Sequence, residues 1–72
     1  MKKIKKIKIK VNGKNKIVKE NTNMLGLIKI LKIPIKKVAI ELNQEIMDKK
    51  KLNHIILKNS DKIEIVHFIG GG

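Results

Sequence analysis

An alternating stretch followed by an Asn-Gly pair restricts the start of this chain to a β-hairpin. Apolar residues at positions 7, 9 and 11 alternate with lysine at positions 6, 8 and 10, which is the period of a half-buried strand. Asn12-Gly13 follows directly and suits the two positive-φ positions of a type I′ turn. Residues 14–19 then supply a second strand containing the apolar pair Ile17 and Val18. Residues 1–5 fall outside this register and are expected to form an extension.

One short amphipathic helix is predicted after the hairpin. Large apolar residues recur with the spacing of one helical face at Met24, Leu27, Ile28 and Leu31. Asn21-Thr22-Asn23 offers N-cap oxygens before the helix, and Pro34 prevents its continuation. Gly26 costs about 1 kcal/mol relative to alanine, which the burial of large apolar side chains offsets at about 1.5–3 kcal/mol each. We interpret the apolar stripe as core.

Two more strands and an irregular segment are expected next. Residues 38–42 alternate as a strand, and Asn43-Gln44-Glu45 predicts a tight turn into a brief strand at Ile46-Met47. Residues 48–58 lack a regular period, so we expect a loop or a short helical turn. Its expected anchors are the apolar residues Leu52, Ile55, Ile56 and Leu57.

The last predicted strand, residues 63–69, follows a turn at residues 58–61. Ile63 and Ile65 are expected to face the core, continued by His67, while the alternate positions Glu64, Val66 and Phe68 face the open side of the sheet. The order of elements predicts an α+β fold in which a mixed sheet of four to five strands packs on one helix. The absence of repeats and linkers predicts a single domain over residues 1–72.

The charge of the chain is not interpreted as a nucleic-acid signal. The net charge of +12 comes from 18 lysines with no arginine, and Phe68 is the only aromatic residue that could stack on a base. Lysine, isoleucine and asparagine share A/T-rich codons, so genome composition is a sufficient explanation for the lysine content. The lysines are still expected to favour acidic partners and to speed their encounter at low salt.

No targeting or membrane-spanning pattern is found. Lysines at positions 5, 6, 8 and 10 interrupt any apolar segment after Met1, so neither a signal peptide nor a membrane span is expected. The chain has no cysteine, which excludes a disulfide framework, a thiolate metal site and a nucleophilic thiol. A cytoplasmic protein is the default expectation.

Residue patterns of self-contained enzymes and metal sites are nearly absent. His54 and His67 lack metal-ligand spacing, and no nucleophile triad, P-loop or glycine-rich dinucleotide fingerprint occurs. The acidic residues are scattered, and Asp61 and Ser60 are interpreted as turn residues, with the Asp61 carboxylate capping neighbouring backbone N–H groups. We therefore predict no catalytic residue, no metal and no bound cofactor.

The chain ends on Ile69-Gly70-Gly71-Gly72, a slender segment whose last carboxylate could enter a slot too narrow for other residues. Together with the Asn12-Gly13 hairpin, the apolar helix, the segment of residues 38–43 and the turn of residues 59–61, this ending resembles the ThiS family of sulfur carriers. The resemblance covers essentially the whole chain. It departs from the family at Asn59-Ser60, where a turn glycine is common, in a longer N-terminus and in the lysine content.

The resemblance implies a ubiquitin-like β-grasp fold whose first and last strands pair in parallel, with a flexible glycine tail. It also implies that an E1-like, ThiF-type adenylating enzyme uses MgATP to convert the Gly72 carboxylate to an acyl-adenylate. Sulfur from a persulfide donor system then replaces AMP and leaves a thiocarboxylate on Gly72. A ThiG-type thiazole synthase takes this sulfur for thiamine biosynthesis, and Gly70 and Gly71 provide the slender approach.

A docking patch is predicted at the base of the tail. Ordering three glycines costs about 1–2 kcal/mol each, so the tail cannot hold a partner by itself. Burial of exposed apolar side chains returns about 1.5–3 kcal/mol apiece. The predicted patch is Val66, Phe68 and Ile69, with Ala39 and Glu41 from the neighbouring strand. The competing interpretation is that Phe68 plugs the end of the core.

Three other functions stay open from the sequence. The molybdopterin synthase small subunit shares the thiocarboxylate chemistry but has a different acceptor. A ubiquitin-like modifier would conjugate to protein lysines through Gly72. A small basic module would bind nucleic acid weakly and without sequence preference, and would lose that binding at modest salt.

Overall fold

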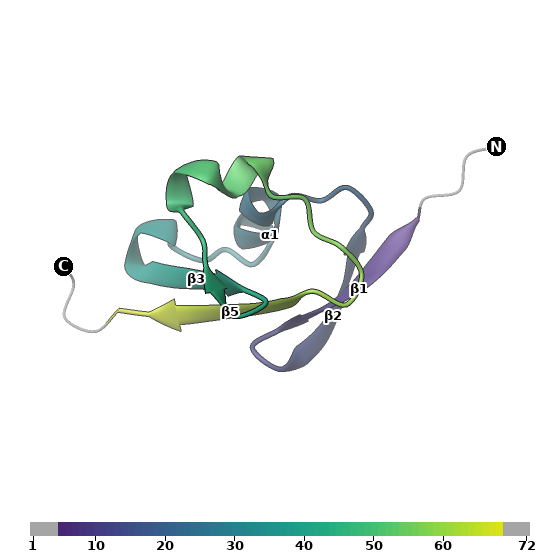
Figure 1. Cartoon of the computed structure of the whole chain (residues 1–72), viewed down its shortest axis with the longest axis horizontal. Helices are drawn as coiled ribbons and strands as arrows, with labels where there is room; N and C mark the ends of the chain where they lie inside the picture. The colour runs from purple at the N-terminus through teal and green to yellow at the C-terminus, as the bar shows by residue number, and fades with distance from the viewer. Residues whose placement is uncertain (1–4, 69–72) are drawn as a thin grey trace.

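A five-stranded sheet covered on one face by helices forms the structure, a computed structural model that describes residues 5–68 (Figure 1). The strands are ordered β2-β1-β5-β3-β4 across the sheet. The elements in chain order are β1 (Lys6–Val11), β2 (Lys14–Lys19), α1 (Met24–Ile30), η1 (Ile35–Lys37), β3 (Val38–Leu42), β4 (Glu45–Ile46), η2 (Lys49–His54) and β5 (Lys62–His67). The predicted α+β arrangement, a mixed sheet against one α-helix, is confirmed.

The predicted hairpin is confirmed in turn and register. Strands β1 and β2 are antiparallel, with Val11 opposite Lys14 across a two-residue turn. Asn12 and Gly13 have φ values of 50° and 82°, which is why an Asn-Gly pair suits this turn. Val18 lies opposite Ile7 and is buried, whereas Ile17 lies opposite Lys8 and is 62% exposed. The apolar pair of β2 therefore divides between the two faces of the sheet.

Helix α1 is shorter at its C-terminus than the apolar spacing predicts. At its start the Asn23 side chain accepts a hydrogen bond from the Gly26 N–H at 2.7 Å. At its end Leu31 is the C-cap, because the chain turns at Lys32, whose φ is 57°. The Ile33 N–H then donates to the Ile28 carbonyl, closing a Schellman-type motif. The fourth apolar position of the stripe thus packs beside the helix without belonging to it.

Glycine at position 26 fits the helix cap. A Cβ added to Gly26 would lie 3.2 Å from the Asn23 side-chain oxygen, closer than most such contacts. The missing side chain therefore leaves room for the capping interaction, which is typically stabilising by about 1 kcal/mol. This offsets the intrinsic cost of glycine within the first helical turn.

One core lies between the sheet and the helical layer. Its buried apolar side chains come from every strand except β4, from α1 and η2, and from the segment before β5. They are Ile9, Val18, Met24, Leu27, Ile28, Val38, Ile40, Leu52, Leu57, Ile63 and Ile65. The Met24, Leu27 and Ile28 stripe is core, as predicted, and within residues 5–68 no polar residue is buried.

The segment between β3 and β5 shows two differences from the prediction. The brief fourth strand is Glu45–Ile46, one residue earlier than expected, because Asn43 and Gln44 alone form the turn at positive φ. Residues 49–54 form the short helical turn η2. Leu52 and Leu57 anchor this segment, but Ile56 is 46% exposed. Ile56 was expected as an anchor, and it points outward because it lies in an extended bridge next to the inward Leu57.

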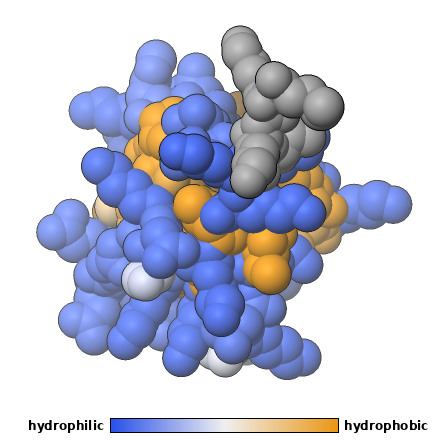
Figure 2. Space-filling view, turned by 90° about the vertical axis from the view of Figure 1, so that its right-hand side faces the viewer, coloured by the Kyte–Doolittle hydropathy of each residue, from blue (hydrophilic) through white to orange (hydrophobic). Residues whose placement is uncertain are grey.

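The end of the molecule opposite the tip of β5 has a mostly hydrophilic surface. Figure 2 faces the right-hand end of Figure 1, away from the tip of β5, and its surface is mostly hydrophilic with smaller hydrophobic areas between. The many lysines of the chain account for this character. Within residues 5–68, no helix has the length and apolar content that crossing a membrane requires.

Candidate functional site

Strand β5 carries the chain toward the predicted functional segment from the middle of the sheet. It pairs in parallel with β1, where Val11 lies opposite Ile63, and antiparallel with β3, where Val38 lies opposite His67. The parallel pairing that the family resemblance implies is therefore present. The strand ends at His67, two residues before the predicted end, and Phe68 continues the ladder only through its N–H, which donates to the Lys37 carbonyl at 2.9 Å.

Asn12 extends the attachment of β5 beyond the regular β1 pairing. Its side-chain oxygen accepts from the Ile65 N–H at 2.8 Å, and its side-chain amide donates to the Ile65 carbonyl at 3.3 Å. The Asn12 backbone N–H donates to the Ile63 carbonyl at 2.9 Å. Asn12 follows the last residue of β1 and thus continues the hydrogen bonding to β5 beyond the end of that strand. Its bonds reach Ile65, three residues before Phe68. Sequence reasoning assigned Asn12 to the turn alone.

The two faces of β5 are sharply different. Ile63 and Ile65 are 1% and 6% exposed and lie in the core, as predicted. On the other face Val66 is 50% exposed and Glu64 is exposed. His67 shares the inward register, yet it is exposed because the core does not extend to the end of the strand. Burial therefore stops at Ile65.

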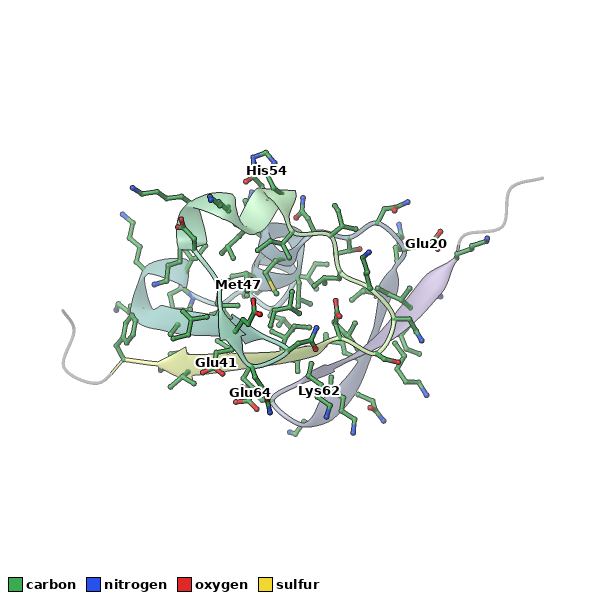
Figure 3. The ribbon with its side chains drawn as sticks, in the orientation of Figure 1. Glu20, Glu41, Met47, His54, Lys62 and Glu64 are labelled. Atoms are coloured by element: carbon green, nitrogen blue, oxygen red, sulfur yellow. The ribbon has the colours of Figure 1, made fainter. Side chains whose placement is uncertain are left out.

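Residues of β3 and β4 complete the open face beside β5. Ala39 lies opposite Val66, Glu41 lies opposite Glu64, and Ile46 lies opposite Glu41. Ile46 is 76% exposed. Figure 3 shows Glu41 and Glu64 on the side of the sheet away from the helices. The predicted neighbours Ala39 and Glu41 are thus adjacent to the outward side of β5, and Ile46 is an additional apolar member.

Phe68 lies just beyond the last paired residue of β5. It is 52% exposed and belongs neither to the core nor to the half-buried side chains that pack on the core. The interpretation that Phe68 plugs the core is therefore wrong. The Lys49 ammonium nitrogen, from η2 in the helical layer, lies 5.0 Å from the centroid of its ring. Such a cation–π contact stabilises by about 0.5–1 kcal/mol at an exposed site and leaves the ring available.

The predicted sulfur-carrying residue and its approach lie outside the described residues. These are Gly72, with Gly71 and Gly70 before it, and Ile69 of the predicted docking patch. The described structure therefore ends at Phe68, and it defines the platform from which the tail continues.

The carboxylates of the turns have structural partners. Asp61 accepts hydrogen bonds from the Lys58 N–H at 2.8 Å and from the Asn43 amide at 3.1 Å, which confirms its predicted role as a turn cap. Asp48 accepts from the Lys50 N–H at 2.9 Å. Among residues 5–68, no group of three or more His, Cys, Asp or Glu side chains could hold a metal ion.

Sequence reasoning missed one member of the open face and one pairing on it. Ile46 was predicted to lie in a strand, but neither face of the sheet was assigned to it. Glu64 was correctly placed on the open side, but its neighbour Glu41 was not recognised as its partner. The alternation of residues 38–42 and 63–68 contains the signal, because residues opposite each other in antiparallel strands share a face. The register that brings Glu41 and Glu64 together comes only from the structure.

Comparison with known proteins agrees with this geometry. A sequence model of the ThiS family matches residues 4–72. The sulfur carrier protein ThiS of Bacillus subtilis is 37% identical over 65 residues, covering 89% of this chain and 98% of that protein. The crystal structure of a thiamine biosynthesis protein (ThiS) from Geobacter metallireducens superposes with a TM-score of 0.81 at 32% identity, covering 92% of this chain and 100% of that chain. This similarity confirms the ubiquitin-like β-grasp fold.

Similarity also extends to part of a larger protein. The thiazole synthase of Magnetococcus marinus is 36% identical over 66 residues, which cover 92% of this chain. The chain spans 20% of the length of that thiazole synthase. The thiazole synthase of Paramagnetospirillum magneticum matches in the same proportion, at 35% identity.

Proposed function

The chain belongs to the ThiS family of sulfur carriers in thiamine biosynthesis, and on that basis we propose that it carries sulfur as a thiocarboxylate on Gly72. The observation that carries the proposal is the extent of the family match, which runs from residue 4 through the three glycines to residue 72. The position of β5 supports it, because a central strand holds the base of the segment that ends at Gly72.

The chemistry begins with activation of a poor leaving group. A carboxylate does not release oxygen to an attacking sulfur, so an adenylating partner first joins the Gly72 carboxylate to AMP, using MgATP and releasing pyrophosphate. The terminal sulfur of a persulfide from the donor system then attacks the acyl carbon and AMP leaves, which gives an acyl disulfide between Gly72 and the donor. A thiol then attacks the donor sulfur of this S–S bond. The bond breaks, the Gly72 thiocarboxylate leaves with the electron pair, and the thiol, as the reductant, ends in a disulfide with the donor. MgATP belongs to the partner, and we propose no cofactor bound to this chain.

The role of this chain is to present its Gly72 carboxylate to the active sites of its partners. Gly70 and Gly71 have no Cβ, so the tail passes through a narrow channel to another active site. Strand β5 anchors the tail through pairing on both sides and through Asn12. Because the reacting group stays covalently attached, the unstable sulfur species is delivered without release into solution. The protein acts as a co-substrate, and its partners supply the catalytic groups.

We propose that Val66, Phe68 and Ile69 form the docking patch, with Ala39 and Glu41 beside them. The exposure of Val66 and Phe68, at 50% and 52%, supports the idea that apolar surface is available to a partner. Because both side chains are already about half-buried, covering the rest of them contributes about 1.5–3 kcal/mol in total, which offsets part of the cost of ordering the glycine tail at about 1–2 kcal/mol per residue.

Thiazole synthase is the proposed sulfur acceptor. Thiazole synthases of two bacteria contain a segment that matches 92% of this chain, which supports a role for this domain beside that enzyme. A ThiF-type adenylating enzyme is the proposed activating partner, since the acyl-adenylate step needs one. The same tail would therefore visit two active sites in turn, each through contact with the face around β5.

Intact mass spectrometry tests the thiocarboxylate directly. The protein is incubated with its adenylating enzyme, MgATP, a persulfide donor and a thiol reductant, and we expect a mass increase equal to the replacement of one oxygen by sulfur. Fragmentation should place the change on Gly72. The matched control lacks only Gly72 and should stay unmodified. An unchanged mass beside an enzyme that demonstrably forms acyl-adenylate would refute sulfur loading, and adducts on protein lysines would point to a modifier instead.

A further inference from the structure

Two carboxylates lie side by side on the open face of the sheet. Glu41 of β3 and Glu64 of β5 are directly opposite in the antiparallel register. Such residues have Cβ atoms about 4.5–5.5 Å apart, and like charges in this arrangement destabilise the sheet. Figure 3 shows both side chains on the same side, away from the helices. The fold therefore tolerates an unfavourable pair at this position.

Neither glutamate has a structural role comparable to that of the turn carboxylates. In the part of the chain that the structure describes, the carboxylates engaged in hydrogen bonds are those of Asp48 and Asp61. The chain carries 18 lysines and only 6 acidic residues. Two of these six occupy one spot on the sheet, so the local charge there is opposite to that of the whole molecule.

Apolar residues border this acidic pair. Ala39 and Val66 are the next opposed residues of β3 and β5 on the same face, and Ile46 lies opposite Glu41 on its other side. Val66 and Ile46 are 50% and 76% exposed. A partner that covers these side chains also removes water from the carboxylates. Burying unpaired carboxylates is costly, so a partner that covers this face must bring a positive charge.

The other half of the open face is basic and sets the orientation. Lys10 of β1 lies opposite Lys62 of β5, and Lys62 precedes Glu64 by two residues on the same face. A positively charged group is repelled there and attracted at the Glu41–Glu64 pair. Placement of a basic partner group one strand too far toward β1 is therefore disfavoured.

We propose that Glu41 and Glu64 together receive one basic side chain of thiazole synthase when that enzyme covers the open face of β3, β4 and β5. An arginine fits best, because its planar guanidinium can donate to two neighbouring carboxylates at once. The inference rests on the proposed function, since it assigns a partner contact to the docking face. Thiazole synthase is the occupant because two relatives of that name contain a segment that matches this chain, so the two units occur together in one protein.

The test is the affinity of the purified carrier for its own organism's thiazole synthase, measured at low and at high salt. Glu41→Gln and Glu64→Gln should each weaken binding about threefold to tenfold at low salt, and the double variant should weaken it further. The salt dependence of the double variant should also be flatter. Lys62→Gln should act in the opposite direction, because it removes a positive charge close to Glu64.

Glu20→Gln is the matched control. It makes the same change of charge in the turn that follows β2, remote from the other two glutamates in Figure 3. Equal weakening by Glu20→Gln would show a general effect of net charge and overturn the proposal. Unchanged affinity of the double variant would also overturn it, as would a loss of affinity for the adenylating enzyme with binding to thiazole synthase intact.

Thermal unfolding separates binding from folding. Because the like-charge pair destabilises the sheet, the double variant should have a Tm higher by about 1–5 °C. Weaker binding by a more stable protein supports the proposal, whereas a lower Tm would indicate a structural role and contradict it. Thiocarboxylate formation by the unaltered protein is measured in the same preparation, so a failure of the sulfur-carrier function is recognised independently.

Discussion

The two faces of β5 are formed by neighbouring residues, yet one face serves folding and the other does not. Ile63 and Ile65 are almost completely buried, whereas Val66 is half exposed and Glu64 lies opposite another carboxylate. A residue that faces the core is selected for packing. The residues that face outward gain little from the fold, and an apolar or repulsive arrangement among them is better explained by a partner.

The largest expected effect is loss of stability from the inward face. Ile63→Ala should lower the free energy of unfolding by about 2–5 kcal/mol, because it removes a fully buried side chain and leaves a cavity. Urea denaturation measures the difference. Val66→Ala is the matched outward control, and it should change stability by less than about 1 kcal/mol. Equal effects of the two substitutions would remove the distinction between the faces.

The next effect belongs to partner binding. Phe68→Ala should weaken binding of the partner enzymes about 10- to 100-fold, because an aromatic ring at the rim of the patch is lost. Its stability should fall by no more than about 1 kcal/mol, the size of the Lys49 contact. Ile17→Ala is the control, since Ile17 is 62% exposed on β2, at the other edge of the sheet. Unfolding of Phe68→Ala would contradict the docking assignment.

A smaller effect is expected where Asn12 attaches to β5. Asn12→Gly keeps the positive φ of 50° but removes two side-chain hydrogen bonds to Ile65, so stability should fall by about 1–2 kcal/mol. Hydrogen exchange of the Ile65 amide should become faster. Asn21→Gly, at a φ of 72°, is the control and should be neutral or stabilising. If Asn12→Gly and Asn21→Gly changed stability equally, the side chain of Asn12 would have no specific role in holding β5.

The smallest expected effect is a gain of stability from a substitution at Ser60, in the turn before β5 and outside both of its faces. Ser60 has a φ of 73°, a left-handed conformation, in the turn before β5. Ser60→Gly should raise the free energy of unfolding by about 0.5–1 kcal/mol, because a left-handed conformation is strained for serine. Partner affinity should stay the same. Ser60→Ala should give no gain, and a gain of equal size would show that strain is not the cause.

Local pattern predicted those parts of the fold that are determined by short-range periodicity. The Asn12-Gly13 turn, the buried stripe of α1 and the inward Ile63 and Ile65 all follow from residues close in sequence. The parallel pairing of β1 with β5 joins residues about fifty positions apart, and only the family resemblance implied it. Contacts of that range depend on how the whole chain closes.

The details that sequence reasoning missed are decided by tertiary contacts. Helix α1 ends before Leu31 because Lys32 adopts a left-handed conformation. Glycine is the usual sequence signal for such a helix end, and position 32 is a lysine. The ion–aromatic contact between Lys49 and Phe68 joins elements with no shared pattern. The Glu41–Glu64 pair was similarly hidden, because each residue taken alone has the form of an ordinary surface glutamate.

The most direct test of sulfur delivery is a single turnover with carrier already loaded with an isotopically heavy sulfur at Gly72. The loaded protein is mixed with thiazole synthase and the other substrates of that enzyme, and both products are analysed by mass spectrometry. We predict that the heavy sulfur appears in the thiazole and that the thiocarboxylate disappears in equal amount. A thiazole that lacks the heavy sulfur, or a thiocarboxylate left intact beside an active thiazole synthase, would contradict this account.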